Sequence, residues 1–122
     1  MKTTILCLSF DKTVSASRKA VLEEAGYTVV ASTTVPDALQ MLSAVSFDLL
    51  IVGHRFSSTD KHKLTAQARE TGTPVLLICG AAAEADIPAD LRVYALEGTT
   101  GLVAAVARVL PAKTAASRPA AA

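Results

Sequence analysis

Five short apolar runs recur along the chain, and they constrain its fold more than any other feature. They span residues 5–8, 27–30, 49–52, 75–78 and 93–96. Several are continuously apolar rather than alternating, which is typical of strands covered on both faces in a parallel sheet. Helical patterns lie between the runs, so strands and helices alternate. Right-handed crossovers then favour an α/β fold, a doubly wound parallel sheet of order 2-1-3-4-5 with helices on both faces.

The first two helical patterns have recognisable ends, whereas the fourth connection is short. Helical spacing in the first pattern is followed by Val14, Arg18, Val21, Leu22 and Ala25. Gly26 supplies its stop, and Pro36 begins the second pattern. Residues 80–91 leave room for only about two helical turns before Pro88 interrupts them. We therefore expect a shortened fourth helix or a loop there.

The third and last helical patterns differ in strength. The third, at about residues 58–70, is weak, and Leu64 and Ala68 mark its inner face. Its positively charged or titratable residues predict a solvated face, and they are Lys61, His62, Lys63 and Arg69. The last pattern is capped by Thr99 or Thr100 and ends before Pro111. Its apolar stripe is formed by Leu102, Val103, Val106, Val109 and Leu110.

The length of 122 residues suits one domain with a sizeable core. We expect that domain to span residues 1–111, and residues 112–122, which lack large apolar side chains, to form a disordered tail. A net charge of +1 gives no drive toward direct nucleic-acid binding or toward an anionic membrane. No apolar run approaches the roughly 20 residues of a membrane span. We therefore expect a cytoplasmic protein.

The two cysteines, Cys7 and Cys79, lie in apolar runs, and we expect buried, reduced thiols. In the predicted order they lie two strands apart, roughly 9–10 Å, which is beyond the reach of a disulfide. His54 and Cys79 would end neighbouring strands. A thiol beside an imidazole can become a nucleophile, so a redox pair is an alternative to a loop histidine beside a buried thiol. No ligand spacing supports a metal site.

Four segments resemble the receiver domain of two-component response regulators. They are residues 22–29 (LEEAGYTV), 37–39 (DAL), 47–52 (FDLLIV) and 73–78 (TPVLLI). The resemblance covers about residues 3–110 and implies a flavodoxin-like (βα)5 fold in a signalling context. It also implies a pocket in which two acidic residues after the first strand help to hold Mg²⁺. An aspartate after the third strand would take a phosphoryl group, with a Thr or Ser and a Lys ending the fourth and fifth strands.

This chain departs from that pocket at each position. The corresponding residues, in chain order, are Ser9, Phe10, Asp11, Gly53, Cys79 and Glu97. Ser9 and Phe10 fall where the acidic pair would be, which leaves only Asp11 one position later, and Gly53 falls on the phosphoacceptor position but has no carboxylate. Because Mg²⁺ needs oxygen ligands, the sequence predicts a pseudo-receiver with no metal, no cofactor and no enzymatic activity.

Without the usual phosphorylation we expect the module to act through protein contacts in two-component or phosphorelay signalling. The resemblance places the family's switch aromatic near Tyr94, on a face that the family uses for dimers and effectors. The outward side of the last helix should carry Thr100, Ala104, Ala107 and Arg108. Tyr94 and Arg108 are the candidate anchors, because aromatic and arginine side chains dominate interface energetics.

Two other functions stay open. The first is a flavodoxin-like domain that binds a small ligand in the crevice at the carboxyl ends of the strands. Loss of the charged pocket residues would make that crevice less polar and suited to an apolar or neutral ligand. The second is a thiol-dependent enzyme built on Cys79.

Overall fold

The computed structural model describes residues 3–79, 89–94 and 98–117, with the backbone alone for Tyr94, Thr99 and residues 111–117. The strands are β1 (Thr4–Leu8), β2 (Thr28–Ser32), β3 (Leu49–Val52), β4 (Val75–Cys79) and β5 (Leu91–Tyr94). The helices are α1 (Lys12–Glu24), α2 (Val35–Ala44), α3 (Ser58–Glu70) and α4 (Gly98–Ser117). Among the helices in these ranges, none is both long and apolar enough to cross a bilayer.

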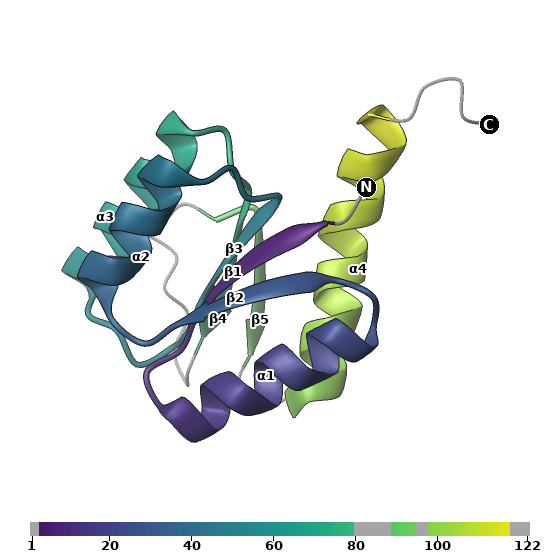
Figure 1. The fold of residues 1–122 in the computed structure, drawn as a ribbon, viewed down its shortest axis with the longest axis horizontal. Coiled ribbons are helices and arrows are strands. Elements are labelled where there is room, and N and C mark those ends of the chain that lie inside the picture. The colour runs from purple at the N-terminus through teal and green to yellow at the C-terminus, as the bar shows by residue number, and fades with distance from the viewer. Residues whose placement is uncertain (1–2, 80–88, 95–97, 118–122) are drawn as a thin grey trace.

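The five strands form one parallel sheet of order β2-β1-β3-β4-β5 (Figure 1). This confirms the predicted fold class and strand order. The central strand β3 is buried along its whole length, as its unbroken apolar run predicts. Parallel strands place their carboxyl ends at one edge of the sheet. The residues that follow β1 and β3 therefore come together there.

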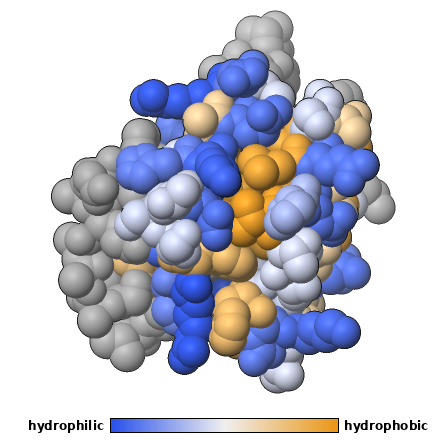
Figure 2. Space-filling view, turned by 90° about the vertical axis from the view of Figure 1, so that its left-hand side faces the viewer, coloured by the Kyte–Doolittle hydropathy of each residue, from blue (hydrophilic) through white to orange (hydrophobic). Residues whose placement is uncertain are grey.

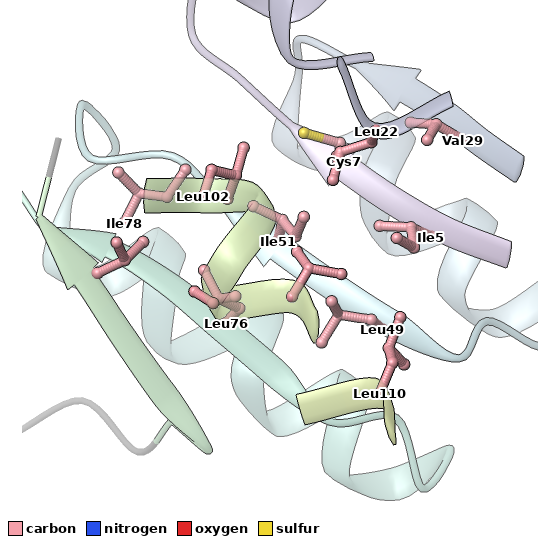
Figure 3. Close-up of a cluster of buried hydrophobic side chains, with 13 residues drawn as sticks. Ile5, Cys7, Leu22, Val29, Leu49, Ile51, Leu76, Ile78, Leu102 and Leu110 are labelled. Carbon is pink, nitrogen blue, oxygen red and sulfur yellow. The ribbon is translucent and has the colours of Figure 1, made fainter. Parts of the chain in front are cut away.

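The sheet divides the core into two layers, because successive side chains of a strand point to opposite faces. In β1, Ile5 and Cys7 pack in the layer under α1 and α4, whereas Leu6 and Leu8 pack under α2 and α3. Figure 3 shows the first layer, where Leu102 and Leu110 of α4 meet side chains from the strands. Both layers consist almost entirely of aliphatic side chains.

The ends of α1 and α3 follow from local hydrogen bonding. Asp11 Oδ1 accepts a hydrogen bond from the backbone N–H of Thr13 at 2.6 Å and caps α1. Gly26, with φ of 106°, takes the left-handed conformation that ends this helix, as predicted. Ser57 caps α3 by accepting from the backbone N–H of Asp60 at 3.1 Å.

The last helix differs from its prediction at both ends. It begins at Gly98, so Thr99 and Thr100 lie inside its first turn and do not precede it as caps. It also continues through Pro111 to Ser117, where the sequence predicts a break and a disordered tail. Alanine, the strongest helix former, supplies half of residues 112–117 and offsets the hydrogen bond that proline removes. The predicted shortened fourth helix falls on residues 80–88, outside the described residues.

Of the four residues predicted on the solvated face of α3, three are exposed and one is buried. His62, Lys63 and Arg69 are exposed, as predicted. Figure 2 shows hydrophilic residues over much of the side formed by α2 and α3, with a group of apolar residues among them. Lys61, predicted on the same solvated face, is instead fully buried at 0% exposure. The prediction is wrong because residues 61, 64, 65 and 68 follow the spacing of a helix's inner face.

The central strand should dominate stability. Leu50→Ala and Ile51→Ala each remove a fully buried side chain, one from each core layer. Each should lower the free energy of unfolding by about 2–5 kcal/mol, through lost burial and a residual cavity. Urea denaturation followed by circular dichroism measures this. Val45→Ala, at a half-exposed position, is the matched control and should cost much less; equal losses in all three variants would contradict the two-layer core.

Candidate functional site

The edge at the carboxyl ends of β1 and β3 brings Ser9 and Gly53 into direct contact. The backbone N–H of Gly53 donates to the carbonyl of Leu8 at 2.9 Å, which extends the pairing of the two strands by one residue. Ser9 is fully buried, and its Cα lies 3.5 Å from the point where a Cβ on Gly53 would be. The structure thus joins two of the six degenerate positions that the sequence singles out.

An arginine lies above this glycine. The Nη1 atom of Arg18, from α1, is 3.3 Å from the position of a Cβ on Gly53, and it donates a hydrogen bond to Ser9 Oγ at 3.1 Å. A side chain at position 53 would therefore meet the guanidinium group. The cation occupies the region where the resemblance implies a carboxylate and a metal ion.

Burial shapes the protonation of this cluster. It lowers the pKa of the half-buried Arg18 guanidinium from its usual value, with the nearby Cys7 acting in the opposite direction. Arginine starts so far above neutrality that Arg18 keeps its charge. Burial also raises the pKa of the Cys7 thiol, against the smaller effects of a Ser9 hydrogen bond and the Arg18 charge. Cys7 is therefore a protonated packing residue at neutral pH, not an activated nucleophile.

A pocket of about 230 Å³ opens beside the cluster. Its lining residues come from the start of α1 and from the residues after β3, and they are Phe10, Asp11, Val14, Arg18, His54 and Arg55. The Phe10 ring is 54% exposed, and the guanidinium carbon of Arg55 lies 5.0 Å from its centroid, in cation–π contact. Two guanidinium groups line the pocket, so it is more positively charged than the less polar crevice that the sequence predicts.

Lys61 of α3 also contacts this edge of the sheet. Its Nζ donates to the carbonyl of His54 at 3.2 Å while its stem is buried with Leu64 and Thr65 on the inner side of α3. The residue ties α3 to the segment that carries His54 and Arg55. Its i, i+3, i+4 relation to Leu64 and Thr65 is the signal that identifies it as an inward residue.

The remaining candidate residues are Cys79, Glu97, Tyr94 and Arg108. Cys79 is a free, buried thiol in the layer under α2 and α3, whereas Cys7 lies in the other layer, so they remain unbridged as expected. Within the described ranges no group of three or more His, Cys, Asp or Glu side chains is placed to hold a metal ion. Glu97 and the side chain of Tyr94 fall outside the described residues. Arg108 is exposed on α4.

No family model and no curated protein matches the chain. Solved structures do. A response regulator receiver protein from Sinorhizobium medicae WSM419 is 25% identical, with 91% of this chain and 96% of that chain covered and a TM-score of 0.81. A response regulator receiver domain protein from Methanospirillum hungatei JF-1 is 18% identical, with 93% and 98% covered and a TM-score of 0.82. A response regulator from Thermotoga maritima is 16% identical, with 91% of this chain and 99% of that chain covered and a TM-score of 0.77. The chain therefore has the receiver-domain fold.

The Arg18–Gly53 juxtaposition should appear as energetic coupling. Gly53→Ala places a Cβ 3.1 Å from the fixed carbonyl of Leu8 and 3.3 Å from Arg18, and should cost about 1–3 kcal/mol of stability through overpacking. In an Arg18→Ala background the cost should fall by at least about 0.5 kcal/mol, because one of the two close contacts is gone. Urea denaturation of the double-mutant cycle measures the coupling.

The control cycle replaces Arg18→Ala by Lys19→Ala. Lys19 is the next residue of α1, and its Nζ lies 3.9 Å from Glu23. The cost of Gly53→Ala should be the same with and without Lys19. Identical behaviour of the Arg18 and Lys19 cycles would show that the guanidinium does not press on position 53.

Proposed function

We propose that this chain is a pseudo-receiver, a two-component signalling module that acts through protein contacts without an acyl phosphate at the usual position. The observation that carries the proposal is Gly53 lying beneath the guanidinium of Arg18 at the edge of a receiver fold. The receiver-fold neighbours support the signalling context, and the identity of the edge residues supports the loss of phosphorylation.

The chemistry of phosphorylation needs groups that this edge lacks. An acyl phosphate forms only on a carboxylate, which glycine does not have. Mg²⁺ is bound by several oxygen ligands, carboxylates among them. Ser9 offers one hydroxyl, which already accepts a hydrogen bond from Arg18. Asp11 is the nearest acid after β1, and its Oδ1 is engaged in capping α1. The fixed charge of Arg18 also repels a cation placed above Gly53.

Acetyl phosphate with Mg²⁺ should therefore leave the protein unmodified. We expect intact-mass spectrometry to show no phosphoryl adduct, and beryllofluoride with Mg²⁺ to leave the backbone amide spectrum unchanged. A receiver domain with an intact acidic pocket, treated in parallel, is the positive control. Gly53→Asp alone should not restore modification, because Ser9 and Phe10 still supply no acidic pair. A phosphoryl adduct on the wild-type chain would contradict the proposal.

The contact surface that we propose is the outward side of α4 together with β5. Thr100, Ala104, Ala107 and Arg108 are all exposed, while Leu102, Val106 and Leu110 face the core. Small residues let another backbone approach closely, and a neighbouring arginine can anchor the contact. Protein partners or a second copy of the chain fit such a surface.

Replacing both anchors should test this surface. Arg108→Glu combined with Tyr94→Ala is expected to reduce self-association or partner capture at least about tenfold, because anchor residues often carry more than 1 kcal/mol each. Sedimentation velocity measures the first and pull-down with a cognate partner the second, with circular dichroism to confirm the fold. Arg69→Glu, an exposed arginine on α3, is the charge-matched control. Normal association of the double variant, with crosslinks mapped to α1 or α2, would contradict the proposal.

The pocket beside Arg18 favours a second candidate, a flavodoxin-like domain that binds a small molecule at the strand ends. Its volume of about 230 Å³ lies somewhat below the usual range for drug-sized ligands, about 300–1,000 Å³. A compact metabolite is therefore the kind of ligand that this candidate would take.

A further inference from the structure

The pocket at the sheet edge has the opposite charge from a metal site. Arg18 and Arg55 both line it, and Asp11 is the one acidic residue among the lining residues. The two cations come from different elements, one from α1 and one from the segment after β3. A ligand in the pocket therefore meets positive charge from two directions.

The carboxylate of Asp11 can offset only one of the two guanidinium charges, and it is held by the end of α1. Its Oδ1 accepts from the backbone N–H groups of Thr13 at 2.6 Å and Val14 at 3.4 Å. These groups belong to the first turn of α1, whose dipole also stabilises the negative charge. The carboxylate is thus bound to the helix end, and the described ion pairs include none between Asp11 and either arginine.

Arg18 retains hydrogen-bonding capacity toward the pocket. A guanidinium has five N–H donors in a planar fork, and among the described residues Ser9 Oγ is the acceptor that Arg18 meets, through Nη1 alone. Ser9, which is fully buried at the end of β1, holds the guanidinium group through this hydrogen bond. An arginine that is positioned by one hydrogen bond and keeps further N–H donors can recognise phosphate or carboxylate oxygens.

The other side of the pocket is apolar. Phe10 is 54% exposed and Val14 is 37% exposed, although both are large hydrophobic residues. Arg55 lies against the Phe10 ring, so its charge and the apolar surface are adjacent. An organic body can rest on Phe10 and Val14 while an anionic group meets the arginines.

We propose that this pocket binds a small phosphomonoester, non-covalently and without a metal ion. A phosphomonoester carries about −1.5 to −2 charges at neutral pH, which matches two guanidinium groups better than the single charge of a carboxylate does. The oxygens of its tetrahedral phosphate group can accept hydrogen bonds from two sides at once. The pocket volume of about 230 Å³ limits the ligand to a phosphate with a small organic body.

This inference rests on the second candidate function, small-molecule binding in this pocket, and not on the proposed protein contacts. The ligand keeps its phosphate, no bond to the protein forms, and the binding needs no Mg²⁺. Failure of the phosphorylation prediction would be seen as a covalent adduct in the presence of Mg²⁺. Failure of the present inference would be seen as an absence of reversible binding in a chelator, so the two results are distinguishable.

The test is a titration of the intact chain with phenyl phosphate, inorganic phosphate and benzoate, in EDTA at fixed ionic strength, followed by backbone amide shifts. We expect saturable shifts at Ser9, Arg18 and Gly53. Phenyl phosphate should bind several-fold more tightly than either probe, because inorganic phosphate lacks the apolar body and benzoate lacks the second charge. Equal affinity of phenyl phosphate and benzoate would refute the preference for phosphate, and equal affinity of the two phosphates would refute the role of Phe10.

Variants locate the site. Arg18→Gln should weaken phenyl phosphate at least about tenfold, the usual scale for a hydrogen bond to a charged group. Arg55→Gln, at an exposed position, should weaken it less, and Arg69→Gln on α3 is the matched control that should change nothing. If Arg18→Gln fails to fold, the Arg55 and Arg69 pair decides the question. No saturable shift, or equal weakening by Arg55→Gln and Arg69→Gln, would overturn the proposal.

Discussion

The Arg18 guanidinium donates a hydrogen bond to the Ser9 hydroxyl and lies against Gly53, which has no side chain. This contact determines the charge at the carboxyl-end edge of the sheet. Arg18 begins about 9 Å along the helix from Lys12, so only a long side chain can reach back to the end of β1. The position of α1 is in turn fixed by its Asp11 cap and by Leu22 in the core. Because Gly53 has no Cβ, the guanidinium can lie against the backbone of the central strands.

The architecture was predictable because its signals are local and redundant. The strands β1, β3 and β4 are nearly continuous apolar runs, and right-handed crossovers limit the sheet to a few strand orders, of which 2-1-3-4-5 is a common one. The predicted range of about residues 58–70 agrees with α3 (Ser58–Glu70), although the apolar pattern of its inner face is weak. The end of α4 did not follow, because the preference of alanine for helix competes with Pro111 and sequence spacing alone does not decide the outcome.

For the site, the sequence predicts only which groups are missing, and that prediction stays untested. The degenerate positions Ser9, Phe10 and Gly53 could be read from the chain, and they indicated a missing acidic pocket. The sequence alone does not single out Arg18 as a site residue, because its position also fits the helical pattern of α1. A charged residue on the inner side of a helix is itself a signal, and both Arg18 and Lys61 carry it: each is drawn inward to a polar atom at the end of a strand. Spacing identifies such residues, whereas counting charges along a helix does not.

The separation between the core and the edge explains how the chemistry can change while the fold is kept. The side chains that hold the two layers together lie on β1, β3, β4 and the inner faces of the helices, whereas Phe10, Asp11, His54 and Arg55 belong to neither layer. Substitutions at the edge therefore leave most of the buried apolar area untouched. They alter the electrostatic potential instead, which depends on a few fixed groups. We infer that Arg18 and Arg55, beside a glycine without a side chain, give this edge a positive potential, where the resemblance implies a site for a divalent cation.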